Sequence, residues 1–287
     1  MRSPPSPTLE GDLDAEDALR RIVATCRDDL IKARAAVLAT GRANAVHQTR
    51  VALRRLRAAL VMFRDVVSNT EMPVLADEAR WLASECAPSR DLHVFLKESS
   101  TDSSGTISRI GAKLARDRLL RARSALGSDR YAAFDLKLGR LASTAPTPGS
   151  PALKAFGQAA LEAQYARVRR RGRKFASLTA AKLHRLRIAV KKLRYAEGFL
   201  RPTFNSATAR AFVQETAHLQ DMLGVAHDRA VAPQMIADIA AAARPSDKAR
   251  SPLKRLAKKL KSGAIGDNRR LRRTWKSFKK VEPFWRT

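Results

Sequence analysis

The sequence contains few cysteines and no long apolar run, and each shortage excludes a class of protein. Two cysteines, Cys26 and Cys86, among 287 residues cannot form a disulfide framework, and their spacing does not fit a zinc site. No apolar run approaches the roughly 18 residues of a membrane-spanning helix, and the N-terminus lacks the apolar stretch of a secretory signal. We therefore expect a folded protein of the reducing cytoplasm with no membrane partner.

Acidic residues are scarce as well. The chain has 27 Asp and Glu against 56 Lys and Arg, which gives a formal net charge of +29. Repulsion of that size opposes folding unless counter-anions are bound. Because 45% of the residues are hydrophobic, the chain can still build a core. The composition predicts a folded basic protein whose partner is a polyanion.

Motifs that carry catalysis are missing too. The sequence shows no glycine-rich phosphate loop, no nucleophile elbow and no paired carboxylates. Asp91 and Asp228, beside His93 and His227, could be imagined as metal ligands, but a helical Asp near a base is more often a structural partner. We predict a protein that is not an enzyme and that uses no metal and no cofactor.

Helix-forming residues dominate what is present, so we predict an all-α fold. The predicted helices cover 13–40, 43–67, 73–86, 88–98, 106–127, 129–143, 152–175, 179–203, 206–224, 226–243 and 249–281, the last broken around Gly263–Gly266. Three prolines and a glycine in 145–151 exclude a continuous helix and predict a linker there. Residues 1–12 are expected to form a disordered tail.

One stretch of the sequence occurs twice. Residues 47–57 (HQTRVALRRLR) recur as residues 184–194 (HRLRIAVKKLR), an offset of 137 residues (184 − 47). Asp91 and Asp228 are separated by the same offset (228 − 91). A constant offset over this length indicates that a whole unit is duplicated. We therefore predict one domain, 13–285, made of two repeats, about 13–144 and 152–285.

Helical geometry places the bases of each copy on one narrow stripe, with leucines on the opposite side. The stripes consist of His47, Arg50, Arg54 and Arg57 in the first copy, and His184, Arg187, Lys191 and Arg194 in the second. Leu56 and Leu193 are predicted to be buried behind them. Glu197 takes the position that Leu60 has in the first copy, and we expect it to pair with a neighbouring base.

A solvated helix face explains a single Arg-rich stripe. Duplication favours a ligand held from two sides, because a solvated face has no reason to keep the same pattern in both copies. Guanidinium groups fork onto phosphate oxygens, and histidine adds N–H donors. We predict that the two stripes face each other across one basic cleft.

The repeated motif, together with residues 219–224 (LQDMLG) leading into Asp228, resembles the CHAD family, the conserved histidine α-helical domain. The resemblance spans residues 13–283. It implies two duplicated helical bundles with pseudo-twofold symmetry around a basic cleft that binds inorganic polyphosphate, and in several bacteria an association with polyphosphate granules. The implied phosphate contacts are the eight stripe residues, with Arg55 and Lys192 as second-line candidates at the stripes' edges.

Further bases lie outside the stripes. Arg167, Arg170, Arg171 and Lys174 share one helix face just before the second copy, and Arg170 and Arg171 are further second-line candidates for phosphate contacts. A solvated face is the alternative for this group. A wide positive field would also raise the capture rate of a long anion.

Two other functions stay open. A nucleic-acid-binding protein fits the charge, but single-strand binders stack bases on aromatic side chains, and the stripes carry only Tyr195 beside Arg194. A scaffold that docks proteins at granule surfaces is compatible with polyphosphate binding. The Glu-x-Glu signature of the triphosphate hydrolases often fused to CHAD domains does not occur in the sequence.

Overall fold

The computed structural model describes residues 9, 13–67, 71–98, 105–145, 149–204, 206–244, 247, 249–262 and 264–286. Within these ranges there are ten α-helices and two short 3-10 helices, and the only β-type pairing is one isolated bridge, so the prediction of an all-α fold is confirmed. The helices are α1 (Ala15–Thr40), α2 (Ala43–Met62), α3 (Glu71–Glu98), α4 (Thr106–Leu126), α5 (Asp129–Ser143), α6 (Leu153–Arg171), η1 (Phe175–Ser177), α7 (Ala180–Leu200), η2 (Arg201–Thr203), α8 (Ala209–Ala242), α9 (Arg250–Ser262) and α10 (Ala264–Phe278).

Two predicted helix breaks are wrong. Residues 71–98 form one helix with Pro88 inside it, and residues 209–242 form one helix that contains both Gly224 and Pro233. A proline removes one hydrogen bond from the helix ladder, and a glycine costs about 1 kcal/mol relative to alanine. Both helices pack along neighbouring helices on either side of these residues, and that packing keeps them continuous. Gly263, at the predicted break, lies outside the described residues; α9 ends at Ser262 and α10 begins at Ala264.

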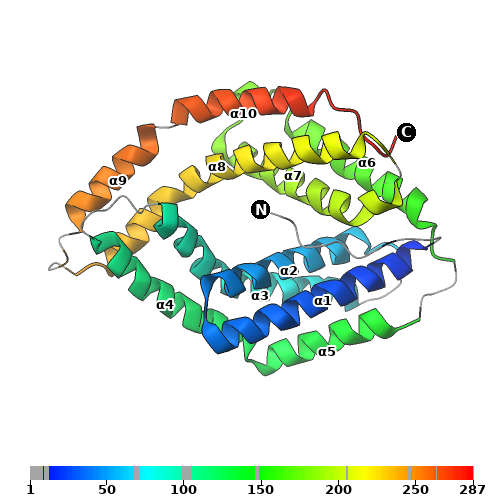
Figure 1. The fold of residues 1–287 in the computed structure, drawn as a ribbon, viewed down its shortest axis with the longest axis horizontal. Helices are drawn as coiled ribbons and strands as arrows, with labels where there is room; N and C mark the ends of the chain where they lie inside the picture. The colour runs from blue at the N-terminus through cyan, green and yellow to red at the C-terminus, as the bar shows by residue number, and fades with distance from the viewer. Residues whose placement is uncertain are drawn as a thin grey trace.

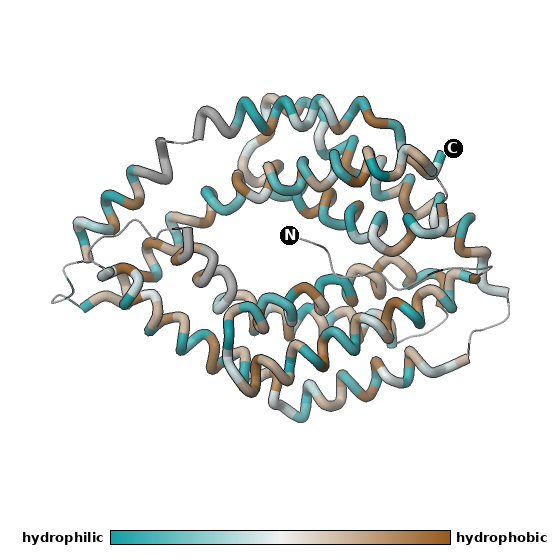
Figure 2. The backbone as a smooth tube through the Cα atoms, in the orientation of Figure 1, coloured by the Kyte–Doolittle hydropathy of each residue, from teal (hydrophilic) through white to brown (hydrophobic). Residues whose placement is uncertain are grey.

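The helices form two groups, α1–α5 and α6–α10, which lie below and above the centre of Figure 1. Matching helices begin at matching residues: α2 starts at Ala43 and α7 at Ala180, an offset of 137 (180 − 43). Hydrophobic and hydrophilic residues alternate along the helices, as amphipathic packing requires (Figure 2). The main core draws buried side chains from both groups, so the two halves share one apolar interior.

The two groups meet at two junctions. At the first, Asp14 and Ala152 form an antiparallel bridge, in which the Ala15 N–H donates to the Pro151 carbonyl at 2.9 Å and the Leu153 N–H donates to the Leu13 carbonyl at 3.0 Å. The offset of 137 carries residues 14 and 152 onto 151 and 15, which are the neighbouring pair in the same bridge. This geometry supports the predicted pseudo-twofold relation between the halves.

The second junction is a separate apolar cluster at the far end of the molecule, where α4 and α9 meet in Figure 1. Leu92, Phe95 and Ile107 of the first half pack there with Ile239 and Leu253 of the second. Arg118 donates to Asp238 across the same junction at 2.5 Å. The halves are therefore fastened at both ends.

The predicted disordered tail and linker lie only partly within the described residues. Residues 1–8, 10–12 and 146–148 lie outside the described residues, but Leu9 is 2% exposed and packs in the main core, so disorder does not extend over all of 1–12. Ser150 in the linker accepts a hydrogen bond from the Glu16 N–H at 3.1 Å. None of the described helices has the length and apolar character needed to cross a membrane.

Candidate polyanion-binding site

Helices α2 and α7 carry the predicted stripes, and the two helices contact each other at the centre of the molecule (Figure 1). Each rests on an apolar face that is fixed in the core. Leu53, Leu56 and Leu60 are buried under α2, and Leu186, Val190 and Leu193 are buried under α7. Burial of Leu56 and Leu193 behind the stripes was predicted and is confirmed. Thr179 accepts a hydrogen bond from the Lys182 N–H and so defines the start of α7.

Lys191 shows that the two stripes meet. Burial, together with the positive charges of Arg187, Arg54 and Arg50, lowers the pKa of its ammonium group to about 7, while Asp228 acts in the opposite direction. Two of these arginines belong to α2 and one to α7. Arg50, Arg54, Arg187 and Lys191 therefore share one electrostatic site. We use the name central cluster for the eight predicted stripe residues, to which these four belong: His47, Arg50, Arg54, Arg57, His184, Arg187, Lys191 and Arg194.

The central cluster holds one buried donor that lacks an acceptor among the described residues. The Nε of Arg54 is shielded from solvent and makes no hydrogen bond to any described residue. Such a donor costs free energy unless a ligand or solvent supplies an acceptor. At the other end, burial lowers the pKa of Arg57, and the positive charge of Arg80 on α3 adds to that effect. An anionic ligand would relieve both costs.

His184 lies at the head of the second stripe and contacts a histidine of α8. Its Nδ1 is 3.3 Å from Nδ1 of His227, and the ring centroids are 5.0 Å apart. His227 occupies the position that Arg90 has in the first half. The sequence pattern did not predict the contact between the two rings.

Arg55, a second-line candidate, does not join the site. Its side chain is 7% exposed, and its guanidinium donates to Asp29 on α1 at 3.1 Å. Arg55 therefore stabilises the packing of α1 against α2, and we remove it from the candidate contacts. Its counterpart Lys192 is exposed. Partial burial lowers the pKa of Lys192, and the positive charges of Arg167, Arg57 and Arg171 add to that effect.

Glu197 does not pair with a base as expected. It is 2% exposed, and within the described part of the chain its carboxylate accepts no hydrogen bond and forms no ion pair. Burial raises its pKa to about 8, although the nearby Thr216 hydroxyl and Arg194 oppose the rise. The side chain is therefore neutral at pH 7 and acts as a polar core residue.

Comparison with known proteins agrees with the fold. The CHAD domain model matches residues 21–237. This chain belongs to the CHAD family. Its fold is similar to that of the CHAD domain from the plant Ricinus communis, with a TM-score of 0.83 and 24% identity over 98% of this chain and 97% of that one. It is also similar to PptA from Streptomyces chartreusis, with a TM-score of 0.66 and 18% identity over 94% of this chain and 100% of that one. No curated protein matches the chain.

The remaining acidic and metal candidates add nothing to the central cluster of this CHAD domain. The side chain of Asp91 lies outside the described residues, and Asp228 acts as a counter-charge to Lys191. In the described ranges, no three His, Cys, Asp or Glu side chains are grouped as a metal site would require.

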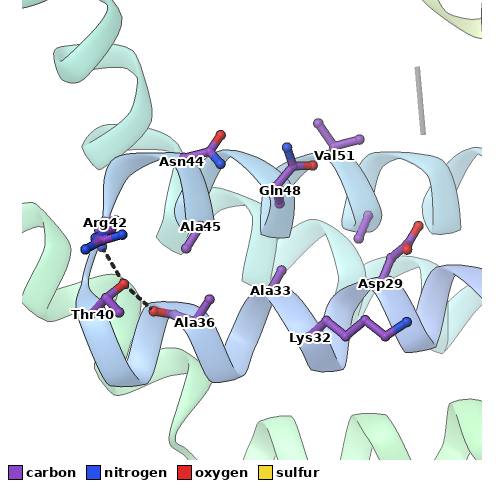
Figure 3. A pocket seen from close by; sticks show the side chains of 11 residues that line it. Asp29, Lys32, Ala33, Ala36, Thr40, Arg42, Asn44, Ala45, Gln48 and Val51 are labelled. Carbon is purple, nitrogen blue, oxygen red and sulfur yellow. Dashed lines mark hydrogen bonds between the residues drawn. The ribbon is translucent and has the colours of Figure 1, made fainter. Parts of the chain in front are cut away.

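A groove lies between α1 and α2 in the first half (Figure 3). It has a volume of about 440 Å³, and Asp29, Lys32, Arg42, Asn44 and Gln48 are among its lining residues. None of the stripe residues lines it. Because the groove mixes both signs of charge, it is a poorer match for a polyanion than the central cluster.

Proposed function

We propose that this CHAD protein binds inorganic polyphosphate along the central cluster and catalyses no reaction. The observation that carries the proposal is the position of Lys191, where cations from both halves act on one buried ammonium group. Assembling these charges is unfavourable in the absence of an anion. A linear chain of phosphates can accept hydrogen bonds from several guanidinium groups at once. Its negative charge also relieves the repulsion between these groups, which favours binding.

The low aromatic content of the site favours polyphosphate over nucleic acid. The sequences of the two stripes, 47–57 and 184–194, contain no aromatic residue, and Tyr195, which follows Arg194, packs against the main core. Single-stranded nucleic acids gain much of their affinity from stacking on exposed rings. Polyphosphate has no bases to stack, and its phosphate oxygens can accept hydrogen bonds from the charged donors of the site. Association with polyphosphate granules, and docking of other proteins there, would follow from this binding.

The test compares two sets of four substitutions that remove the same charge. The site variant carries Arg50→Ala, Arg54→Ala, Arg187→Ala and Arg194→Ala. The control variant carries Arg109→Ala, Lys113→Ala, Arg116→Ala and Lys258→Ala, all exposed positions of α4 and α9. Loss of charge-assisted hydrogen bonds should weaken long-chain polyphosphate binding by at least about 100-fold in the site variant. The control should lose only a few-fold, through the general field.

Both affinities should be measured by titration calorimetry at physiological salt, alongside single-stranded DNA of equal total charge. Equal losses in the two variants would contradict a defined site and indicate a diffuse basic surface. Equal affinity of the unmodified protein for DNA and polyphosphate would favour a general polyanion binder, with nucleic acid as a competing partner.

A further inference from the structure

The turn between α6 and α7 carries a dense basic surface outside the central cluster. We name it the turn surface and define it by Arg170, Arg171, Arg173, Lys174, Lys182 and Arg185, which line a pocket of about 490 Å³. A second pocket of about 570 Å³ adjoins it, because Arg173 and Lys174 line both. No Asp or Glu lines either pocket. Among the described residues, none of the six bases of the turn surface forms an ion pair.

The turn is held in place by packing against α10. Phe175 stacks on Trp275 with ring centroids 5.1 Å apart and an angle of 12° between the planes. Gly172 lies so close to the same ring that an added Cβ would be 2.2 Å from it. Arg272 donates to the Ala176 carbonyl at 3.2 Å. These contacts fix Lys174 in the left-handed region at φ 52°, a conformation that costs a non-glycine residue about 1 kcal/mol.

A fixed turn matters for binding, because its backbone need not be immobilised when the ligand arrives. The turn surface therefore has the properties of a binding site: uncompensated charge, a hollow and a backbone that is already ordered. A solvated basic face would have no need of the stacked rings or of the constrained Lys174.

Lys192 connects the turn surface to the central cluster. It responds electrostatically to Arg57 of the central cluster on α2, and also to Arg167 and Arg171 of α6. Lys192 and Arg185 lie about 80–100° around α7 from His184, on the opposite side of His184 from the other stripe residues. Lys192 therefore links Arg57 on one side with Arg171 on the other. The charges that act on Lys192 are all positive.

We propose that the turn surface is a second binding site for polyphosphate, occupied by the part of a long chain that extends beyond the central cluster. The inference rests on the proposed function, because the central cluster holds the first part of the same chain. The stripe of α7 from His184 to Arg194 is about 15 Å long. A short polyphosphate fills only that length, whereas a long one reaches both sites and gains from their tethering.

The experiment uses the full chain and two probes, tripolyphosphate and long-chain polyphosphate. The turn variant carries Arg170→Ala, Arg173→Ala, Lys182→Ala and Arg185→Ala, and the site and control variants described above serve as references. Thermal unfolding of each variant verifies the fold. We expect the turn variant to bind long chains at least about tenfold more weakly than the control variant, while its affinity for tripolyphosphate stays within about twofold of the control.

The outcomes separate the two proposals. A turn variant that binds long chains as tightly as the control overturns the second site, and so does one that loses affinity equally for both probes. A turn variant that loses affinity only for single-stranded DNA would assign the surface to nucleic acid instead. If the site variant behaves like the control while the turn variant loses long-chain binding, the proposed function of the central cluster fails and the turn surface stands.

Discussion

The two halves of the molecule manage their charge in different ways. Residues 13–144 hold 23 Lys and Arg against 16 Asp and Glu, whereas residues 152–285 hold 31 against 9. In the first half Arg27 of α1 binds Asp135 of α5 at 2.7 Å. The matched positions in the second half are Gln164 and Arg272, so an acid at this interface has become a base. Accordingly α5 packs on α1, while α10 packs mainly on α8.

This difference shows which part of the duplicated unit is constrained. The stripe helices α2 and α7 kept the same pattern of bases, although the helices around them diverged. Arg272, freed from an ion pair, instead supports the turn between α6 and α7. The first half therefore neutralises its outer surface, and the second half leaves its outer surface basic. Matched substitutions in the two halves can test each part of this comparison.

The largest expected effect is at the matched pair Leu60 and Glu197. Both are buried, at 1% and 2% exposure, and Ala79 in the first half matches Thr216 in the second. Leu60→Glu would place a carboxyl group in an apolar site that lacks the hydroxyl. We expect the free energy of unfolding at pH 7 to fall by about 3–5 kcal/mol, measured by urea denaturation. A loss below about 1 kcal/mol would mean that the first half tolerates a buried carboxyl group as well as the second half does.

Glu197→Gln is the companion variant, and its effect depends on pH. The pKa of Glu197 is about 8 in the folded protein and near 4.5 in the unfolded chain, so the native protein loses stability as pH rises from about 4.5 to 8. Glutamine does not titrate. The variant should match the native protein at pH 4 and exceed it by a few kcal/mol at pH 8.5, at about 1.4 kcal/mol per pKa unit. An equal difference at both pH values would refute the raised pKa.

A second matched pair, Arg55 and Lys192, should separate stability from binding. Arg55→Ala removes the partner of Asp29, and we expect the free energy of unfolding to fall by about 1–3 kcal/mol with little change in polyphosphate affinity. Lys192→Ala should leave stability unchanged and weaken long-chain binding about three- to tenfold. Denaturation and titration of both variants give the comparison, and a larger affinity loss for Arg55→Ala than for Lys192→Ala would reverse the assignment.

The smallest effect concerns pH and the matched pair Arg54 and Lys191. Because the pKa of Lys191 is about 7 without ligand, binding of an anion must draw a proton onto it above that pH. Polyphosphate affinity should therefore fall as pH rises from 7 to 8.5, by no more than about tenfold per pH unit. Lys191→Arg should flatten this dependence, since arginine stays charged. Persistence of the full slope in that variant would place the titrating group elsewhere.

Local sequence patterns predicted the features that depend on one helix alone. The stripes and their apolar backing follow from helical periodicity, and Leu56 and Leu193 are buried as that periodicity requires. Arg55 and Lys192 have the same position in the pattern but differ in the structure. Arg55 meets Asp29, whereas the residue matched to Asp29 in the second half is Ala166. The neighbouring helix decides the outcome, and its position cannot be read from the pattern.

The helix breaks and the turn surface were harder to predict for the same reason. Pro88 and Pro233 are strong local signals, yet packing along α3 and α8 outweighs them. Arg170 and Arg171 were recognised as basic, but the turn that carries their pocket packs on the ring of Trp275, which is 104 residues further along the chain (275 − 171). The contact between His184 and His227 likewise joins residues 43 apart.

The bridge between Asp14 and Ala152 sets an order of events during synthesis. The ribosome completes α1 to α5 before Ala152 and the helices after it emerge, so the first half must wait with its share of the common core uncovered. Contacts this distant in sequence also slow folding, because a long loop has to close before they form. The ion pairs that the first half makes within itself, such as Arg27 with Asp135, can form during that interval. Among the described helices, α10 is the last to add its buried side chains to the core.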